Sequence, residues 1–165
     1  MSLSRTLAIL AAAVSLTACH PRPAALPDQS AAGKAFLATN AKAEGVKLTP
    51  KGVQFKVVRS GPATGLRPHL QDEVKVHYEG KLLDGTVFDS SYERGQPAAL
   101  PLRGLIPAWQ EALQLMRPGD EWILYVPPEM GYGAGGQGPI PPGAVLIFRI
   151  ELIDVLPGPG SVGNG

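Results

Sequence analysis

Repeated two-residue alternation of apolar and polar side chains, broken once by a helical period, is the strongest constraint on the fold of this chain. Residues 53–57 and 73–79 both alternate in this way, which is typical of half-buried strands. In the second segment we expect Val74, Val76 and Tyr78 to point inward. Asp84-Gly85, a dipeptide common in tight hairpin turns, follows shortly after it.

The period changes between Leu105 and Met116. Ile106, Trp109, Leu113 and Met116 fall on one helical face, and Pro107 suits the first turn of a helix. Strands are predicted over residues 121–126 and 144–155, with a long loop rich in glycine and proline between them. The predicted class is therefore α+β, a twisted antiparallel β-sheet of about five to six strands with one short α-helix.

The first 19 residues match the pattern of an export signal. One basic residue precedes an apolar run of about ten residues, which is too short to span a bilayer comfortably. Leu16-Thr17-Ala18-Cys19 resembles a bacterial lipobox, which implies cleavage after a signal peptide of residues 1–18 and lipidation of Cys19. Cys19 is the single cysteine of the chain, and lipidation would explain it. The alternative is an ordinary cleaved leader with an incidental cysteine.

Three further segments surround the predicted domain. Residues 19–30, rich in proline and alanine, are expected to form a flexible tether. A helix is predicted over 31–45, with Ser30 as N-cap, Gly45 as stop and a weak apolar stripe that leans on the following domain or on a partner. The domain itself is assigned to 46–156, and residues 157–165 are expected to be disordered.

The charge balance argues against a nucleic-acid partner. The chain has 15 basic and 14 acidic residues, and removal of the leader deletes Arg5, so the mature chain would be neutral. A neutral chain without basic runs lacks the electrostatic footprint of a protein that binds nucleic acid or an anionic membrane. We therefore expect membrane attachment through the lipid at Cys19 only.

Residue types that usually carry chemistry are few. The three histidines are not at metal-ligand spacing, and no serine lies in a nucleophile elbow, so neither a metal nor another cofactor is predicted. Spacing alone neither favours nor rules out a paired-carboxylate site. Large aromatic and aliphatic residues gather beside loops, and they form either a plain core or a cleft. They are Tyr78, Phe88, Ile106, Trp109, Tyr132, Ile140 and Phe148.

Six short motifs occur in the order and near the spacing found in the FKBP family of peptidyl-prolyl cis/trans isomerases. They are residues 76–80 (VHYEG), 84–97 (DGTVFDSSYERGQP), 105–109 (LIPAW), 132–133 (YG), 140–142 (IPP) and 146–152 (LIFRIEL). From about Val46 to Leu156 the chain thus resembles this family, and within it the bacterial Mip-like lipoproteins. The segment 40–46 before the domain also looks Mip-like.

This resemblance implies an FKBP-like fold and a site. Trp109 would form the floor of an apolar pocket, with Tyr78, Phe88, Ile106 and Phe148 as walls and Ile140 on a closing loop. The Tyr132 hydroxyl and the Ile106 N–H would donate hydrogen bonds to the substrate, and Leu105 would contact it through its backbone. Asp89, paired with Arg94, would either polarise the substrate amide or simply cap the Ser90-Ser91 turn.

Two positions depart from the family pattern. Many members have phenylalanine where this chain has Ala98, so we expect a thinner pocket wall there. The loop between Tyr132 and Ile140 is one residue short, and Gln137 lies near a place where some members have histidine.

The resemblance implies a prolyl isomerase that acts on proline-containing exported polypeptides, binds macrolide-type inhibitors and is lipid-anchored in the cell envelope. His20, rather than aspartate, after the cysteine favours the outer membrane. The alternative is a weakly catalytic chaperone or binding module that uses the same groove. The segment 28–45 looks too short for the helical dimerisation region of Mip-like relatives, which favours a monomer.

Overall fold

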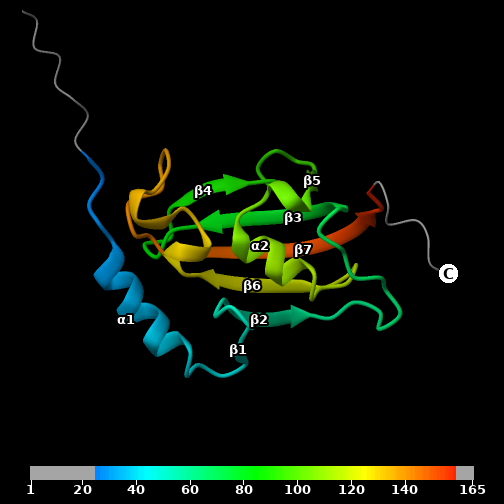
Figure 1. The fold of residues 1–165 in the computed structure, drawn as a ribbon, viewed down its shortest axis with the longest axis horizontal. Coiled ribbons are helices and arrows are strands. Elements are labelled where there is room, and N and C mark those ends of the chain that lie inside the picture. Colours follow the sequence, from blue (N-terminus) through cyan, green and yellow to red (C-terminus); the bar gives the residue numbers. More distant parts are fainter. Residues whose placement is uncertain (1–24, 159–165) are drawn as a thin grey trace, which may run out of the picture.

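The computed structural model describes residues 25–158, and its centre is one antiparallel sheet (Figure 1). The strands follow the spatial order β1-β2-β6-β7-β3-β4, and β5 also pairs with β3. Their bounds are β1 Val46–Leu48, β2 Gln54–Arg59, β3 Glu73–Lys81, β4 Val87–Ser90, β5 Ala98–Pro101, β6 Glu121–Val126 and β7 Leu146–Leu156. The α+β class is confirmed, with seven strands rather than five or six.

Helices cover one face and one end of this sheet. They are α1 Ser30–Asn40, α2 Pro107–Leu113 and the short 3₁₀ turns η1 Leu102–Gly104, η2 Pro128–Met130 and η3 Gly133–Gly135. In Figure 1, α2 crosses in front of the sheet, whereas α1 lies beside it near β1. None of the helices within residues 25–158 is long and apolar enough to cross a membrane.

The central strand β3 shows the predicted alternation. Val74, Val76 and Tyr78 are buried, whereas Lys75 is exposed. One edge of β3 pairs with β7 along its whole length, and the other edge is shared. There, β5 pairs with Glu73–Val76 and β4 with Glu79–Lys81. The chain between β4 and β5 therefore leaves the sheet beside the middle of β3.

Helix α2 is shorter than the predicted 105–116 segment. Pro107 occupies the first turn, and the helix ends at Leu113, after which two tight turns lead to Met116. Three of the four residues of the predicted apolar face are nonetheless buried, since Trp109, Leu113 and Met116 are each at most 4% exposed. The fourth, Ile106, precedes the helix and is half-buried. Helical periodicity thus identified the correct face but overestimated the length of the helix. The flanking turns of 3₁₀ type have a similar residue period, so the sequence pattern does not separate them from the α-helix.

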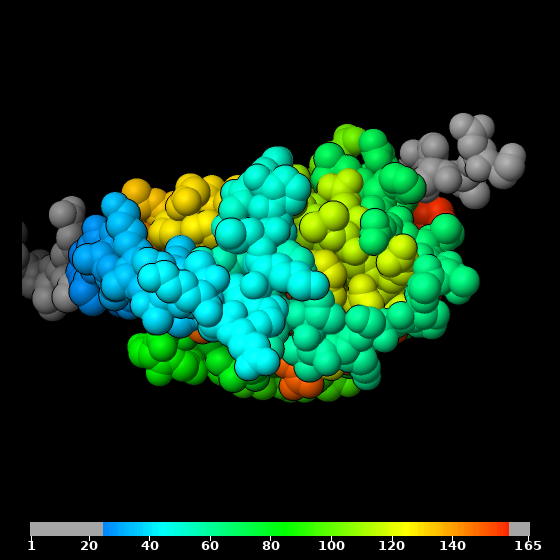
Figure 2. All heavy atoms as spheres, turned by 90° about the horizontal axis from the view of Figure 1, so that it is seen from below, coloured from blue at the N-terminus to red at the C-terminus, as the bar shows by residue number. Residues whose placement is uncertain are grey.

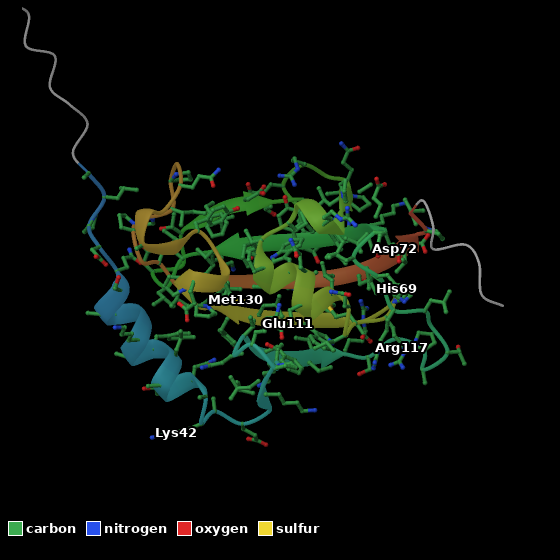
Figure 3. All side chains as sticks on the ribbon, in the orientation of Figure 1. Lys42, His69, Asp72, Glu111, Arg117 and Met130 are labelled. Carbon is green, nitrogen blue, oxygen red and sulfur yellow. The ribbon has the colours of Figure 1, made fainter. Side chains whose placement is uncertain are left out.

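A side-chain anchor joins α2 to the turn between β1 and β2. The Glu111 carboxylate accepts one hydrogen bond from the Thr49 hydroxyl at 2.7 Å and one from the Lys51 N–H at 2.9 Å. Figure 3 shows Glu111 between α2 and β2. The anchor fixes α2 over the sheet, which matters because α2 supplies the floor of the pocket described below.

Helix α1 occupies Ser30–Asn40, which corrects the predicted range of 31–45. After Asn40 the chain makes tight turns, because it must reverse direction and pair with β2 from Val46 onward. Gly45, at φ 77°, supplies a left-handed residue to these turns rather than the helix stop. Ser30 is the first helical residue, not the N-cap. The Ser30 N–H donates a hydrogen bond to the Asp28 carboxylate at 2.7 Å.

The short strands β1 and β5 were not predicted. Each has three or four residues, too few for a two-residue period to stand out. The predicted signal peptide 1–18, residues 19–24 of the tether, including Cys19, and residues 159–165 of the tail lie outside the described residues.

Candidate functional site

A cavity of about 600 Å³ opens between α2, β3, β4 and the loop that follows η3. Its walls are mostly apolar or aromatic. They consist of Tyr78, Phe88, Asp89, Leu100, Gly104, Leu105, Ile106, Trp109, Tyr132, Gln137, Gly138, Pro139, Ile140 and Phe148. A concave apolar site with a few convergent polar groups is the usual form of a small-ligand or peptide-side-chain pocket.

Four aromatic rings form a continuous edge-to-face cluster around the cavity floor. The Trp109 ring contacts the Tyr78 ring at a centroid distance of 5.1 Å and the Phe148 ring at 5.2 Å, both nearly perpendicular. Phe88 meets Phe148 in the same way at 5.6 Å. Such pairs lock the ring orientations, so the apolar walls are rigid before any ligand arrives.

The polar side of the cavity is a three-residue network. The Tyr78 hydroxyl donates to the Asp89 carboxylate at 2.6 Å. Arg94 donates to the other Asp89 oxygen at 2.5 Å and to the Tyr78 hydroxyl at 2.9 Å. Arg94 also lies over the Tyr78 ring, 5.4 Å from its centroid. The network holds the Asp89 carboxylate in one orientation at the rim.

This network lowers the pKa of Asp89. Burial raises that pKa, but the hydrogen bonds from Tyr78 and Arg94 and the Arg94 charge outweigh it, and the net pKa lies below the usual value. Burial, together with the bond to Asp89, raises the pKa of Tyr78. At neutral pH the site therefore holds the ionised Asp89 carboxylate and the neutral Tyr78 phenol, whose hydroxyl donates its hydrogen bond to that carboxylate.

Several hydrogen-bond donors at the cavity are left without partners among the described residues, and the buried Nε1–H of Trp109 at the floor is one of them. The backbone N–H of Ile106, just before α2, and the hydroxyl of Tyr132 both lack an acceptor within residues 25–158. Both residues line the cavity. Gln110 supports the turn before Ile106, because its side-chain amide donates to the Leu105 carbonyl at 2.7 Å. The arrangement offers two donors to a carbonyl-bearing ligand.

The loop over residues 137–140 closes one side of the cavity. The N–H of Gln137 donates to the Ile140 carbonyl at 3.0 Å, and the N–H of Ile140 donates to the Gln137 carbonyl at 2.9 Å. This small hairpin brings Gly138 and Pro139 to the rim and buries Ile140, which is 6% exposed.

Nine of the ten pocket residues inferred from the sequence line this one cavity. The tenth, Arg94, is not among the lining residues, and it acts on the site through Asp89 and Tyr78. Sequence reasoning missed Leu100, Gly104, Gly138 and Pro139 as lining residues. It noted Gln137 only as a departure in the loop.

The wall beside β5 differs from the expectation at Ala98. Ala98 is half-buried and pairs with Val76, but it does not line the cavity. Leu100, two residues later on the same face of β5, does so instead. A two-residue alternation applied to the short segment 98–101 would have identified Leu100 as a lining residue.

Comparison with protein families gives two matches. Residues 65–153 match the family described as FKBP-type peptidyl-prolyl cis-trans isomerase. Residues 16–57 match a domain described as amino terminal to FKBP-type peptidyl-prolyl isomerase. The first match contains every residue of the cavity, and the second includes α1 and β1.

Individual relatives agree with this. The chain is 52% identical over 123 residues to the peptidyl-prolyl cis-trans isomerase Mip of Coxiella burnetii, covering 74% of this chain and 53% of that protein. It is 44% identical over 129 residues to the outer membrane protein MIP of Legionella longbeachae, covering 78% and 54% respectively. The chain thus spans about half the length of these relatives.

The chain also matches nearly the whole length of one solved structure. The crystal structure of a peptidyl-prolyl cis-trans isomerase from Pseudomonas syringae superposes with a TM-score of 0.72 at 37% identity, over 78% of this chain and 93% of that one.

Proposed function

Because the chain belongs to the family of FKBP-type peptidyl-prolyl cis-trans isomerases, we propose that it accelerates the isomerisation of X-Pro bonds in exported polypeptides. The observation that carries this proposal is the rigid aromatic cavity, which has the unpartnered donors of Ile106 and Tyr132 and a fixed carboxylate at its rim. No cofactor is needed for the reaction.

The chemistry suits such a cavity because no bond is broken. The barrier is the loss of amide resonance, about 18–20 kcal/mol. Unaided isomerisation takes roughly tens to hundreds of seconds, long enough to limit folding. A planar amide is charge-separated, whereas the twisted amide has lost much of that dipole. An apolar box that excludes water therefore favours the twisted form over the planar one.

The polar groups of the site have distinct roles in this proposal. The proline ring packs on Trp109, between the flanking aromatic walls. The Ile106 N–H and the Tyr132 hydroxyl hold carbonyl groups of the twisted peptide. Asp89, fixed by Tyr78 and Arg94, places negative charge at the rim, where the rotating amide group passes. Lowering the barrier by about 7 kcal/mol would accelerate the reaction roughly 10⁵-fold.

Replacing Tyr132 with phenylalanine tests the contribution of one donor. The hydroxyl has no partner within the described residues, so its removal leaves no group of the protein unsatisfied. We expect kcat/KM to fall by roughly two- to tenfold, the value of one neutral hydrogen bond of about 0.5–1.5 kcal/mol, with an unchanged urea midpoint. The measurement is a protease-free isomerisation assay on a proline peptide. Unchanged kcat/KM would remove Tyr132 from the mechanism.

The second candidate function is a binding or chaperone module that holds proline-containing segments with little turnover. The absence of an aromatic residue at Ala98 favours it, because a wall built from Leu100 encloses a proline ring less completely. The same assay with a macrolide-type pocket inhibitor separates the two. An isomerase loses its activity when the inhibitor fills the cavity. A binding module binds the peptide and releases it when the inhibitor is added, but it does not accelerate isomerisation even without the inhibitor.

We also propose that the domain is anchored in the cell envelope by lipid on Cys19, as a monomer. The lipobox-like residues 16–19 support the attachment, and a relative named as an outer membrane protein supports the location. Cys19→Ala is expected to abolish incorporation of a fatty-acid analogue and to release the protein from membranes. If the Cys19→Ala protein still incorporates the analogue, the proposed lipid anchor is refuted. Ser15→Ala is the matched control and should incorporate the analogue normally.

A further inference from the structure

The start of α1 is seated on the loop that closes the cavity. The N–H of Gln29 donates to the Pro142 carbonyl at 2.9 Å. Gly143, at φ 66°, lies directly under Ser30 and Asp28, because a Cβ on Gly143 would overlap the Ser30 hydroxyl. Figure 2 shows α1, in blue, against the golden segment that contains this loop.

Gly33 makes the closest part of this contact possible. It is the one buried residue of α1, and a Cβ placed on it would lie 2.8 Å from the Val145 Cγ2 atom. Val145 is fully buried and β-branched, so its side chain cannot easily rotate aside. The helix therefore reaches this depth only with glycine at position 33.

The other end of α1 is fixed to the sheet. The Asn40 side-chain amide donates to the Gln54 side-chain oxygen at 2.8 Å, and Gln54 donates back to the Leu37 carbonyl, also at 2.8 Å. Phe36 contacts the Tyr125 ring at a centroid distance of 5.8 Å. Gln54 and Tyr125 are themselves paired across β2 and β6. The helix thus spans from the rigid sheet to the cavity loop.

Backbone bonds connect the seat of α1 to the cavity wall. The Gly143 N–H donates to the Gly133 carbonyl at 3.1 Å, and Ala144 donates to the Pro141 carbonyl at 3.3 Å. Gln137 and Ile140 are bonded in both directions within the same loop. A displacement of residues 142–145 is therefore passed to Ile140 and Pro139, which line the cavity.

We infer that Gly33 is a positioning residue of the binding site: by letting α1 dock, it holds the 137–143 loop against the substrate. This rests on the proposed isomerase function. Within the described residues, no ring contact or hydrogen bond joins α1 to Tyr78, Phe88, Trp109 or Phe148, so the chemical step depends on these rings and not on the helix. Undocking lowers the fraction of molecules with a closed loop, and apparent affinity falls in proportion to that fraction.

Two substitutions of graded size test the inference in the full-length protein. Gly33→Ala and Gly33→Leu are expected to raise KM for a proline peptide, by about fivefold for the larger residue, with kcat within twofold. Amide exchange should become faster at Ile140 and Gly143 and stay unchanged in β6 and β7. Alanine and leucine both have a higher intrinsic helix propensity than glycine. Faster amide exchange in these variants must therefore come from loss of the contact between α1 and the loop. Ala35→Leu, on the exposed side of α1, is the matched control.

A compensating change isolates the contact. Val145→Ala removes the obstructing methyl group, and a Cβ on residue 33 would then lie 3.7 Å from the Cβ of residue 145 and 3.6 Å from the Gly143 carbonyl oxygen. Gly33→Ala combined with Val145→Ala should therefore have a lower KM than the product of the single effects predicts. Additive single effects would contradict direct contact between these positions.

The outcomes separate the inference from the proposed function. If exchange shows α1 released by Gly33→Leu while KM and Ile140 exchange are unchanged, the helix does not position the loop. If α1 stays docked despite leucine, the role of Gly33 is refuted. If the unaltered protein shows no isomerase activity, the proposed function fails, and macrolide affinity together with exchange at Ile140 still decides whether Gly33 positions the loop.

Discussion

Replacing Gly80 with alanine is expected to lower kcat/KM for prolyl isomerisation by roughly 10- to 100-fold. A Cβ on Gly80 would lie 2.6–2.7 Å from two atoms of the Phe88 ring and 2.8 Å from the Phe148 ring. Gly80 is on β3, directly opposite Phe148 of β7 and Asp89 of β4. One added methyl group therefore pushes against two walls of the cavity at once.

The expected magnitude follows from overpacking. Forcing extra volume into a well-packed core costs about 1–3 kcal/mol, and these rings cannot relax independently because they contact each other edge-to-face at 5.6 Å. The urea midpoint should fall as well. Gly135→Ala is the control, since its Cβ would meet nothing within 4 Å and its φ is not left-handed. Full activity in Gly80→Ala would mean that the ring walls do not contact the substrate.

Replacing Asp89 with alanine is expected to lower kcat/KM by about 10- to 100-fold, the equivalent of a charge-assisted hydrogen bond worth about 1.5–3 kcal/mol. The substitution removes the rim carboxylate and releases the Tyr78 hydroxyl and the Arg94 guanidinium from it. Isomerisation and macrolide binding should be measured together. Retention of both would assign Asp89 to the Ser90-Ser91 turn alone.

Asp89→Asn separates charge from shape and adds a pH test. Since the folded-state pKa of Asp89 lies below its ordinary value, ionisation stabilises the fold above the unfolded pKa of about 3.9. That contribution is lost as pH falls through the still lower folded pKa. The stability difference between the unaltered protein and Asp89→Asn should therefore be constant from pH 5 to 8 and shrink only in acid. A difference that changes near pH 6 would contradict this.

How far the fold follows from sequence can be judged at β3 and α1. The alternation over residues 73–79 predicted the buried face of β3, because a two-residue period over seven residues assigns each side chain to one face. Helix α1 was placed within one residue at its start and five at its end. Its length depends on where β1 must pair with β2, which is a contact between segments and leaves no local signal.

The candidate site shows the same division. The motifs around Tyr78, Asp89, Trp109 and Ile140 identified the cavity members through their resemblance to the FKBP family, because residue type and order can be compared without a structure. The structure decided that Leu100 rather than Ala98 forms the β5 wall, and that Arg94 acts from outside the cavity.

Sequence alone thus determined the α+β class, the burial of one face in each long element and most of the residues around the cavity. The class and the buried faces follow from side-chain chemistry at short, regular spacings, whereas the cavity residues follow from the resemblance of six motifs to the FKBP family. Only the tertiary structure decided that Gly33 lies on Val145, that Gly80 contacts two aromatic rings and that the Tyr78 hydroxyl joins the predicted pair of Asp89 and Arg94. These contacts join residues from separate elements, and their distances depend on how the sheet, α1 and the loops pack together.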